Sequence, residues 1–135
     1  MATLRFKSRA EHELSVVCED RPGTLAQIAQ LFAEAKVNIL AVSCAPSGMQ
    51  GAVRLVVDRP DRAKKALDQA HVSYAEHDVL YVELPNVPGA LAEFAGRLAS
   101  QNINLTTSYG TSTSGSKKMV VVFRVSDLAK SLKLR

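Results

Sequence analysis

The chain has 135 residues, and with 47% hydrophobic residues it can build one ordinary domain or two small ones, which excludes a disordered chain. Seventeen Lys and Arg against thirteen Asp and Glu leave a net charge of +4 spread over both halves, a balance that does not require nucleic acid. The longest apolar run, Met119 to Phe123, is too short to cross a bilayer and the first five residues lack signal-peptide features, so we expect a cytoplasmic protein without a membrane partner.

The first half of the chain carries signals for six elements. Alternation over residues 14–18 predicts a strand with one buried face, and Pro22-Gly23 ends it. Apolar residues at helical spacing from Leu25 to Phe32 predict a helix, with Asn38 at its exit. The remaining elements are a strand opening at Asn38-Ile39, a polar turn, a strand with Val53, Leu55 and Val57, a helix from Pro60 to Ala70, and a strand from Val72 to Tyr74.

The second half repeats this design. Sliding the sequence by 66 residues without a gap places twelve of 55 residues on identical ones, which indicates a duplicated unit. The matches place Leu14, Val16, Pro22, Gly23, Leu25, Ala26, Ala29, Ala33, Asn38, Asp61, Ala63 and Lys64 on Leu80, Val82, Pro88, Gly89, Leu91, Ala92, Ala95, Ala99, Asn104, Asp127, Ala129 and Lys130. We expect the same register to hold through the closing helix, from about Asp127 to Leu132, after which the chain ends before a fourth strand.

The order β-α-β-β-α-β, with two split β-α-β crossovers, predicts an α+β fold of two tandem ferredoxin-like units, each an antiparallel sheet with helices on one face. We expect the first unit, with an N-terminal extension, to cover residues 1–77 and the second to cover residues 78–135 without its last strand. The extension Leu4 to Lys7 alternates like a strand, and it either fills the vacant edge of the second unit or remains a frayed arm.

Each predicted first helix begins at a Pro-Gly pair with chemistry suited to an amino acid. Gly23 and Gly89 let a ligand approach the backbone, and the amides that open the following helix favour a carboxylate. Asp20 can receive an ammonium group, and Asn38 offers a donor and an acceptor. The same residues are also ordinary turn and helix-end chemistry, and only their recurrence at one offset favours a ligand site.

These motifs resemble the D/N-x-P-G-x-L and I-N-I signature of ACT domains, over roughly residues 12–134, and above all the small free-standing proteins made of two tandem ACT domains. The resemblance implies a regulatory, non-catalytic module that binds an amino acid or similar effector between paired domains, without a cofactor. The implied ligand-binding residues are Asp20, Arg21, Pro22, Gly23, Thr24, Leu25, Asn38 and Ile39 in the first copy, and Asn86, Val87, Pro88, Gly89, Ala90, Leu91, Asn104 and Leu105 in the second.

Other functions find less support in the sequence. The stretch from Gly110 to Lys117 resembles a phosphate-binding loop, but Lys stands at the wrong position and a strand follows. The predicted strands rich in β-branched residues lack the aromatic side chains on which an RNA-binding domain stacks bases. No set of residues forms a catalytic constellation. The three histidines lack the spacing of metal ligands. Cys18 and Cys44 are expected to be buried free thiols.

Two functions therefore remain open from the sequence. One is an effector sensor that signals to a regulated enzyme or regulator, and the other is a pure assembly module resembling a regulatory subunit of an amino-acid biosynthetic enzyme such as acetolactate synthase. In either case we expect a homodimer that covers incomplete sheet edges and the apolar faces of Val53, Val57 and Val121.

Overall fold

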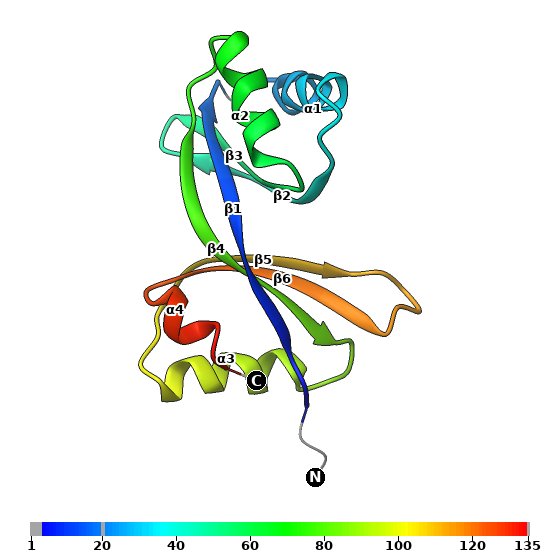
Figure 1. Ribbon diagram of the computed structural model, residues 1–135, viewed down its shortest axis with the longest axis vertical. Coiled ribbons are helices and arrows are strands. Elements are labelled where there is room, and N and C mark those ends of the chain that lie inside the picture. The colour runs from blue at the N-terminus through cyan, green and yellow to red at the C-terminus, as the bar shows by residue number, and fades with distance from the viewer. Residues whose placement is uncertain (1–3, 20, 135) are drawn as a thin grey trace. The chain divides into compact units, whose positions relative to one another are not determined.

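The computed structural model describes residues 4–19 and 21–134 of the chain (Figure 1). Within these residues it contains six strands and four helices. In chain order they are β1 (Lys7–Cys18), α1 (Thr24–Glu34), β2 (Ile39–Ser47), β3 (Gln50–Val57), α2 (Pro60–Gln69), β4 (Ala75–Pro85), α3 (Ala90–Ser100), β5 (Leu105–Ser112), β6 (Lys118–Val125) and α4 (Leu128–Ser131).

The chain divides into two compact units, and the division falls within β1 and within β4. The first unit is His12–His77, and the second combines the residues up to Glu11 with those from Asp78 onward. The strands are hydrogen-bonded in the order β2-β3-β1-β4-β6-β5. The first unit thus uses β2-β3-β1-β4, and the second uses β1-β4-β6-β5. Both are ferredoxin-like, as the sequence predicts.

In the first unit, alternation along the strands directs one set of side chains toward α1 and α2, which cover one face of the sheet (Figure 1). β1 pairs antiparallel with β3, with Leu14 opposite Leu55 and Val16 opposite Val53. Phe32 of α1 is fully buried against these strands, a burial that stabilises the unit by about 1.5–3 kcal/mol. The rest of this core is Ile28, Val37, Val57, Ala63 and Leu67.

The second unit repeats this packing with larger side chains. β4 pairs antiparallel with β6, with Leu80 opposite Phe123 and Val82 opposite Val121. Phe94 of α3 stacks on Phe123 with ring centroids 5.7 Å apart. The edge beside β4 is taken by β1, and Leu4 and Phe6, which precede β1, pack against the same core. The rest of this core is Leu84, Ala90, Leu98 and Ile103.

The gapless register of the repeat is wrong beyond the second hairpin. Val53 lies opposite Cys44, and Val121 lies opposite Gly110, so the offset is 66 on the earlier strand and 68 on the later one. Between equivalent paired positions, the β5–β6 hairpin therefore holds two more residues than the β2–β3 hairpin. Ala63 of α2 therefore corresponds to Ser131, and both are fully buried.

The predicted strand at residues 72–74 is wrong, because the strand begins only at Ala75. The strand predicted around Leu80 and Val82 is confirmed as part of the same continuous strand, β4, which runs from Ala75 to Pro85. The closing helix is confirmed as a short turn of helix. α4 spans Leu128–Ser131, and the Asp127 carboxylate caps it by accepting a hydrogen bond from the Lys130 amide at 3.0 Å.

Two burial predictions are also wrong. Val53, Val57 and Val121 are buried in the helix-covered cores of their own units, so they offer no apolar face to a second chain. Cys44 is exposed and Cys18 half-buried, although both are free thiols. The exposure of Cys44 follows from its place on β2, the edge strand of the first unit.

Candidate functional site

The first signature loop is a turn that the Thr24 side chain ties to the backbone. Gly23 has φ +93° and caps α1 in a left-handed conformation that favours glycine. The Thr24 hydroxyl donates hydrogen bonds to the carbonyl oxygens of Glu19 and Arg21, each at 3.1 Å. Asp20 lies outside the described residues. Arg21, Pro22 and Leu25 are exposed, so the loop presents a solvent-accessible helix start.

The need for glycine at position 23 has a backbone cause. A Cβ placed on Gly23 meets no atom within 4 Å, and the same is true of Gly89. Crowding inside the chain therefore does not select glycine at either position. The positive φ does so without a ligand being needed.

The second signature loop has the same backbone but is tied to a hairpin. Gly89, with φ +89°, caps α3. The Asn86 side-chain amide donates to the Ser116 carbonyl oxygen at 2.9 Å, and its backbone amide donates to the Lys117 carbonyl oxygen at 2.9 Å. Ala90 is buried, while Val87, Pro88 and Leu91 are exposed.

The two signature asparagines have matching backbone roles. The Asn38 amide donates to the Asp58 carboxylate at 2.8 Å, and the Asn104 amide donates to the Ser126 hydroxyl at 2.9 Å. Both side chains are exposed. The residues that follow, Ile39 and Leu105, are half-buried and pack on the cores of their units.

Each unit separates its asparagine from its Pro-Gly loop. Gly23 precedes α1 and Asn38 follows it, and eleven helical residues span about 16 Å. Gly89 and Asn104 are divided by α3 in the same way. Within one unit, therefore, the loop and the asparagine do not meet.

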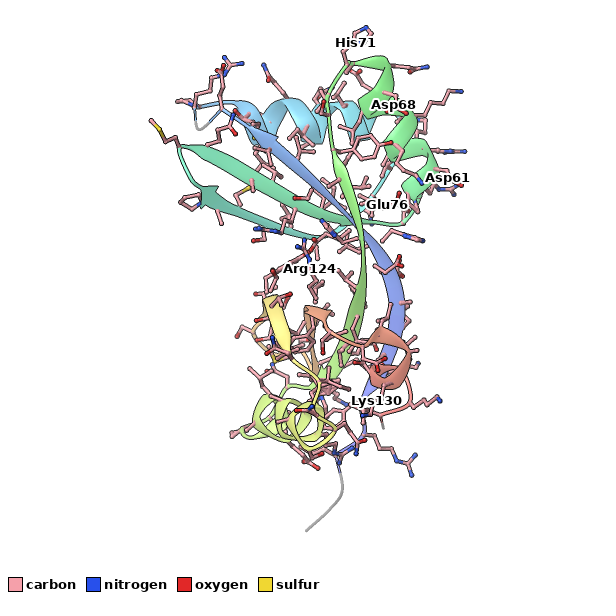
Figure 2. The ribbon with its side chains drawn as sticks, turned by 90° about the vertical axis from the view of Figure 1, so that its left-hand side faces the viewer. Asp61, Asp68, His71, Glu76, Arg124 and Lys130 are labelled. Carbon is pink, nitrogen blue, oxygen red and sulfur yellow. The ribbon has the colours of Figure 1, made fainter. Side chains whose placement is uncertain are left out.

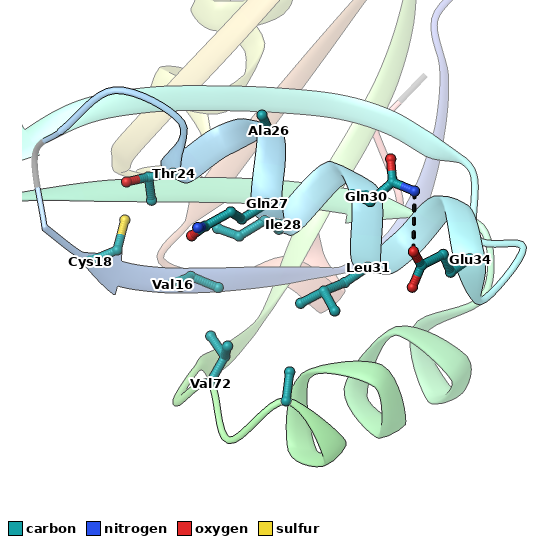
Figure 3. A pocket seen from close by; sticks show the side chains of 11 residues that line it. Val16, Cys18, Thr24, Ala26, Gln27, Ile28, Gln30, Leu31, Glu34 and Val72 are labelled. Atoms are coloured by element: carbon teal, nitrogen blue, oxygen red, sulfur yellow. Dashed lines mark hydrogen bonds between the residues drawn. The ribbon is translucent and has the colours of Figure 1, made fainter.

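A groove of about 680 Å³ opens beside the first loop, between α1 and the segment that follows α2 (Figure 3). Its apolar lining comes from Val16, Ile28, Leu31 and Val72. Its polar groups are Thr24, Gln27, Gln30, Glu34 and the Cys18 thiol. Gln30 donates a hydrogen bond to the Glu34 carboxylate at 3.2 Å. The sequence analysis identified only Thr24 of these as a site residue.

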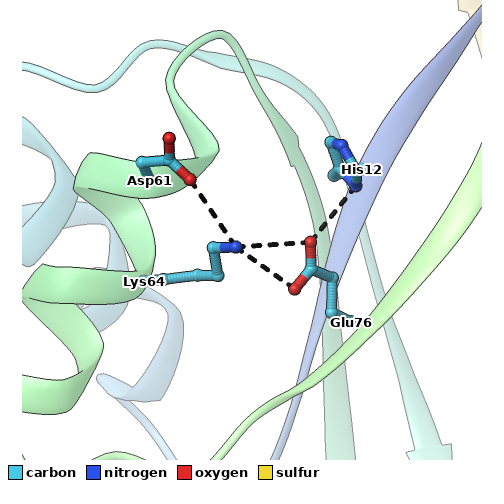
Figure 4. Close-up of polar contacts among 4 residues, drawn as sticks. All are labelled: His12, Asp61, Lys64 and Glu76. Atoms are coloured by element: carbon cyan, nitrogen blue, oxygen red, sulfur yellow. Dashed lines mark hydrogen bonds and ion pairs between the residues drawn. The ribbon is translucent and has the colours of Figure 1, made fainter.

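The most connected ion-pair cluster of the described side chains lies on another part of the first unit (Figure 4). Glu76, at the start of β4, contacts His12 Nδ1 at 3.2 Å and Lys64 Nζ at 3.3 Å, and Asp61 lies 3.6 Å from the same Nζ. The hydrogen bond to Glu76 raises the pKa of Lys64 above its ordinary value. Figure 2 shows Asp61 and Asp68 along α2 and Glu76 on β4. The cluster joins three elements, β1, α2 and β4.

Metal and membrane sites receive no support from the described residues. No three His, Cys, Asp or Glu side chains among residues 4–19 and 21–134 gather closely enough to hold a metal ion. In the same part of the chain, no helix has the length and hydropathy to span a membrane.

Comparison with known proteins is consistent with this architecture. Residues 10–134 match the family model described as an ACT domain pair. The crystal structure of protein BT0572 from Bacteroides thetaiotaomicron is similar, with 29% identity, coverage of 93% of this chain and 86% of that one, and a TM-score of 0.84. The ligand-free regulatory subunit of aspartate kinase from Thermus thermophilus shares the fold at 17% identity, with 97% and 93% coverage and a TM-score of 0.73. No curated protein matches the sequence.

Proposed function

The chain belongs to the ACT domain pair family, and on that premise we propose that it is a non-catalytic regulatory protein that binds an amino acid or similar small effector. In this proposal the effector carboxylate lies at the start of α1, and occupancy is transmitted to a partner protein such as a regulated enzyme. The free thiol of Cys44, exposed at a strand edge, fits a reducing cytoplasmic location.

One observation carries the proposal. Both units open a helix with an exposed Pro-Gly turn in the same left-handed conformation, so the same kind of helix start recurs in one chain. The amides at a helix start favour an anionic group. The fold shared with a regulatory subunit of aspartate kinase over 97% of this chain supports a regulatory role rather than a catalytic one.

The separation of Gly23 from Asn38 supports a homodimer in this proposal. A free amino acid is too small to contact both groups across about 16 Å of α1. If both signature groups serve one ligand, Asn38 comes from a second copy of the chain. The dimer therefore completes the site, and binding and association are coupled.

A thermal-shift screen of the full chain against the twenty amino acids tests the proposal. A ligand that binds only the folded state raises the melting temperature, by an amount that grows with its concentration over the dissociation constant. We expect at least one amino acid to stabilise the chain. If all twenty leave the melting temperature unchanged at millimolar concentration, the effector function is wrong for free amino acids.

Assembly without an effector is the second candidate, and the sheet edges favour it. β2 and β5 are edge strands of their units, and neither carries a charged residue. Edge strands without charges pair readily with other chains. A chain that dimerises and binds a partner but no amino acid would support this candidate over the sensor.

A further inference from the structure

The two copies of the repeat differ in side-chain size at two positions of the first helix. At the offset of 66, Ile28 corresponds to Phe94 and Leu31 corresponds to Arg97. A third difference, between Val72 and Phe6, lies beside the sheet. Val72 lines the groove of the first unit together with Cys18. In the second unit, Leu84 corresponds to Cys18, and the residue that lines a hollow together with Leu84 is Phe6.

The second unit fills this place with its own ring. Phe6 contacts Phe94 edge to face, with centroids 5.0 Å apart and an interplanar angle of 80°. The Arg97 guanidinium lies 4.6 Å from the centroid of the Phe6 ring and is held there by an ion pair with Glu93. The N-terminal segment thus packs a phenyl ring between α3 and the sheet.

The first unit leaves the same place open. Val72, Ile28 and Leu31 are smaller than Phe6, Phe94 and Arg97, and the groove of about 680 Å³ lies among them. This volume falls within the range of ligand pockets, roughly 300–1,000 Å³. The second unit therefore has a phenyl ring at this place, and the first unit has none at the equivalent place.

The charge of the groove lining restricts which ligand side chains can bind there. Among the described residues that line the groove, Glu34 is the one charged residue, and no Lys, Arg or His joins it. An acidic side chain would face this carboxylate across an apolar floor without a cation to offset the repulsion. An uncharged ring or branched aliphatic chain meets no such penalty.

We propose that this groove holds the side chain of the effector, which is an amino acid with an aromatic or bulky aliphatic side chain, and that the Phe6 ring leaves the second unit only a smaller hollow of about 430 Å³ at the equivalent place. The inference rests on the proposed function and names the effector class for it. Thr24 links the groove to the first signature loop, so the main chain of the same ligand lies beside the start of α1.

Calorimetric titration of the full chain with L-phenylalanine, L-leucine, L-alanine and L-aspartate tests the assignment. We expect L-phenylalanine or L-leucine to bind at least tenfold more tightly than L-alanine, and L-aspartate to bind most weakly. Val72→Phe installs the ring that the second unit already has, and it should weaken binding at least tenfold while the melting temperature holds. Gln27→Trp fills the groove from an exposed position and tests the same point without altering the core.

Met49→Phe is the matched control. Met49 is fully exposed in the β2–β3 turn, so this substitution adds the same ring away from the groove. It should leave binding unchanged. If wild-type chain binds an amino acid but both groove variants bind it equally well, the groove assignment is wrong and the proposed function stands. If wild-type chain binds none of the twenty amino acids, the proposed function fails and this inference fails with it.

Discussion

The Asn86 side chain donates a hydrogen bond to the Ser116 carbonyl oxygen at 2.9 Å, which joins the second signature loop to the turn of the β5–β6 hairpin. A carboxylate in place of the amide cannot donate this bond and faces a carbonyl oxygen instead. We expect Asn86→Asp to lower the free energy of unfolding by about 0.5–1.5 kcal/mol in urea denaturation. Asn104→Asp is the control, since the Asn104 side chain is exposed and its backbone amide donates to the uncharged Ser126 hydroxyl; equal losses in both variants would contradict this role.

Substitutions at Gly23, which has a left-handed conformation, distinguish an effect on stability from an effect on ligand binding. At φ +93°, Gly23→Ala should destabilise the chain by about 1–2 kcal/mol, whereas Gly23→Asn should cost less, because asparagine tolerates positive φ. Both substitutions place a side chain where the structure leaves open space. If the ligand lies against this turn, Gly23→Asn should fold and yet lose binding. A Gly23→Asn chain with unchanged affinity in calorimetry would show that the glycine serves only the turn.

The repeat shows which parts of the fold can be predicted from the sequence. The spacing of Leu14, Val16 and Cys18 predicts a strand face, and the structure confirms it, because alternation depends only on local geometry. The offset fails after the second hairpin because turn length is set by a few exposed residues that leave little pattern. The groove was missed for a different reason. Its lining brings together Val16, the residues of α1 and Val72, which are far apart in sequence, so no local pattern marks it.

Edge strand β2 gives a test of association. Val42 is 47% exposed on this strand, so a charge there should leave the core of the first unit intact. If β2 pairs with a second chain, Val42→Lys should shift the chain from dimer to monomer in analytical ultracentrifugation. A lysine on an edge strand opposes pairing with another strand. Val87→Lys changes an exposed valine outside the strands and should not do so. A wild-type chain that is monomeric at high micromolar concentration would remove the dimer from the proposal.

The pKa of Lys64 gives a pH-dependent prediction. Its hydrogen bond to Glu76 raises the folded pKa above the ordinary 10.5, so the pair stabilises the fold fully below that value and loses its contribution as pH rises through the folded pKa. Glu76→Gln should therefore lower the urea midpoint at pH 8, and the difference from wild type should narrow above about pH 10.5.

Glu93→Gln is the control for this titration. The partner of Glu93 is Arg97, whose guanidinium stays charged throughout the same range. The difference in midpoint between Glu93→Gln and wild type should remain constant with pH. A constant difference for Glu76→Gln as well would show that Glu76 acts on the fold without Lys64.

The acidic residue of the first signature loop distinguishes the two copies, because Asp20 stands where the second copy has Asn86. A carboxylate that meets a ligand ammonium forms a charge-assisted hydrogen bond worth about 1.5–3 kcal/mol, against roughly 0.5–1.5 kcal/mol for a neutral amide. Asp20→Asn should therefore weaken binding of an amino acid about fivefold, the equivalent of about 1 kcal/mol, and should barely affect its deaminated analogue, which lacks the ammonium group. Glu19→Gln controls for general charge loss, since Glu19 pairs with Arg21 at 3.0 Å. Equal losses for the amino acid and its analogue in the Asp20→Asn chain would mean that Asp20 acts through the turn, and the ammonium contact would have to be assigned to another carboxylate.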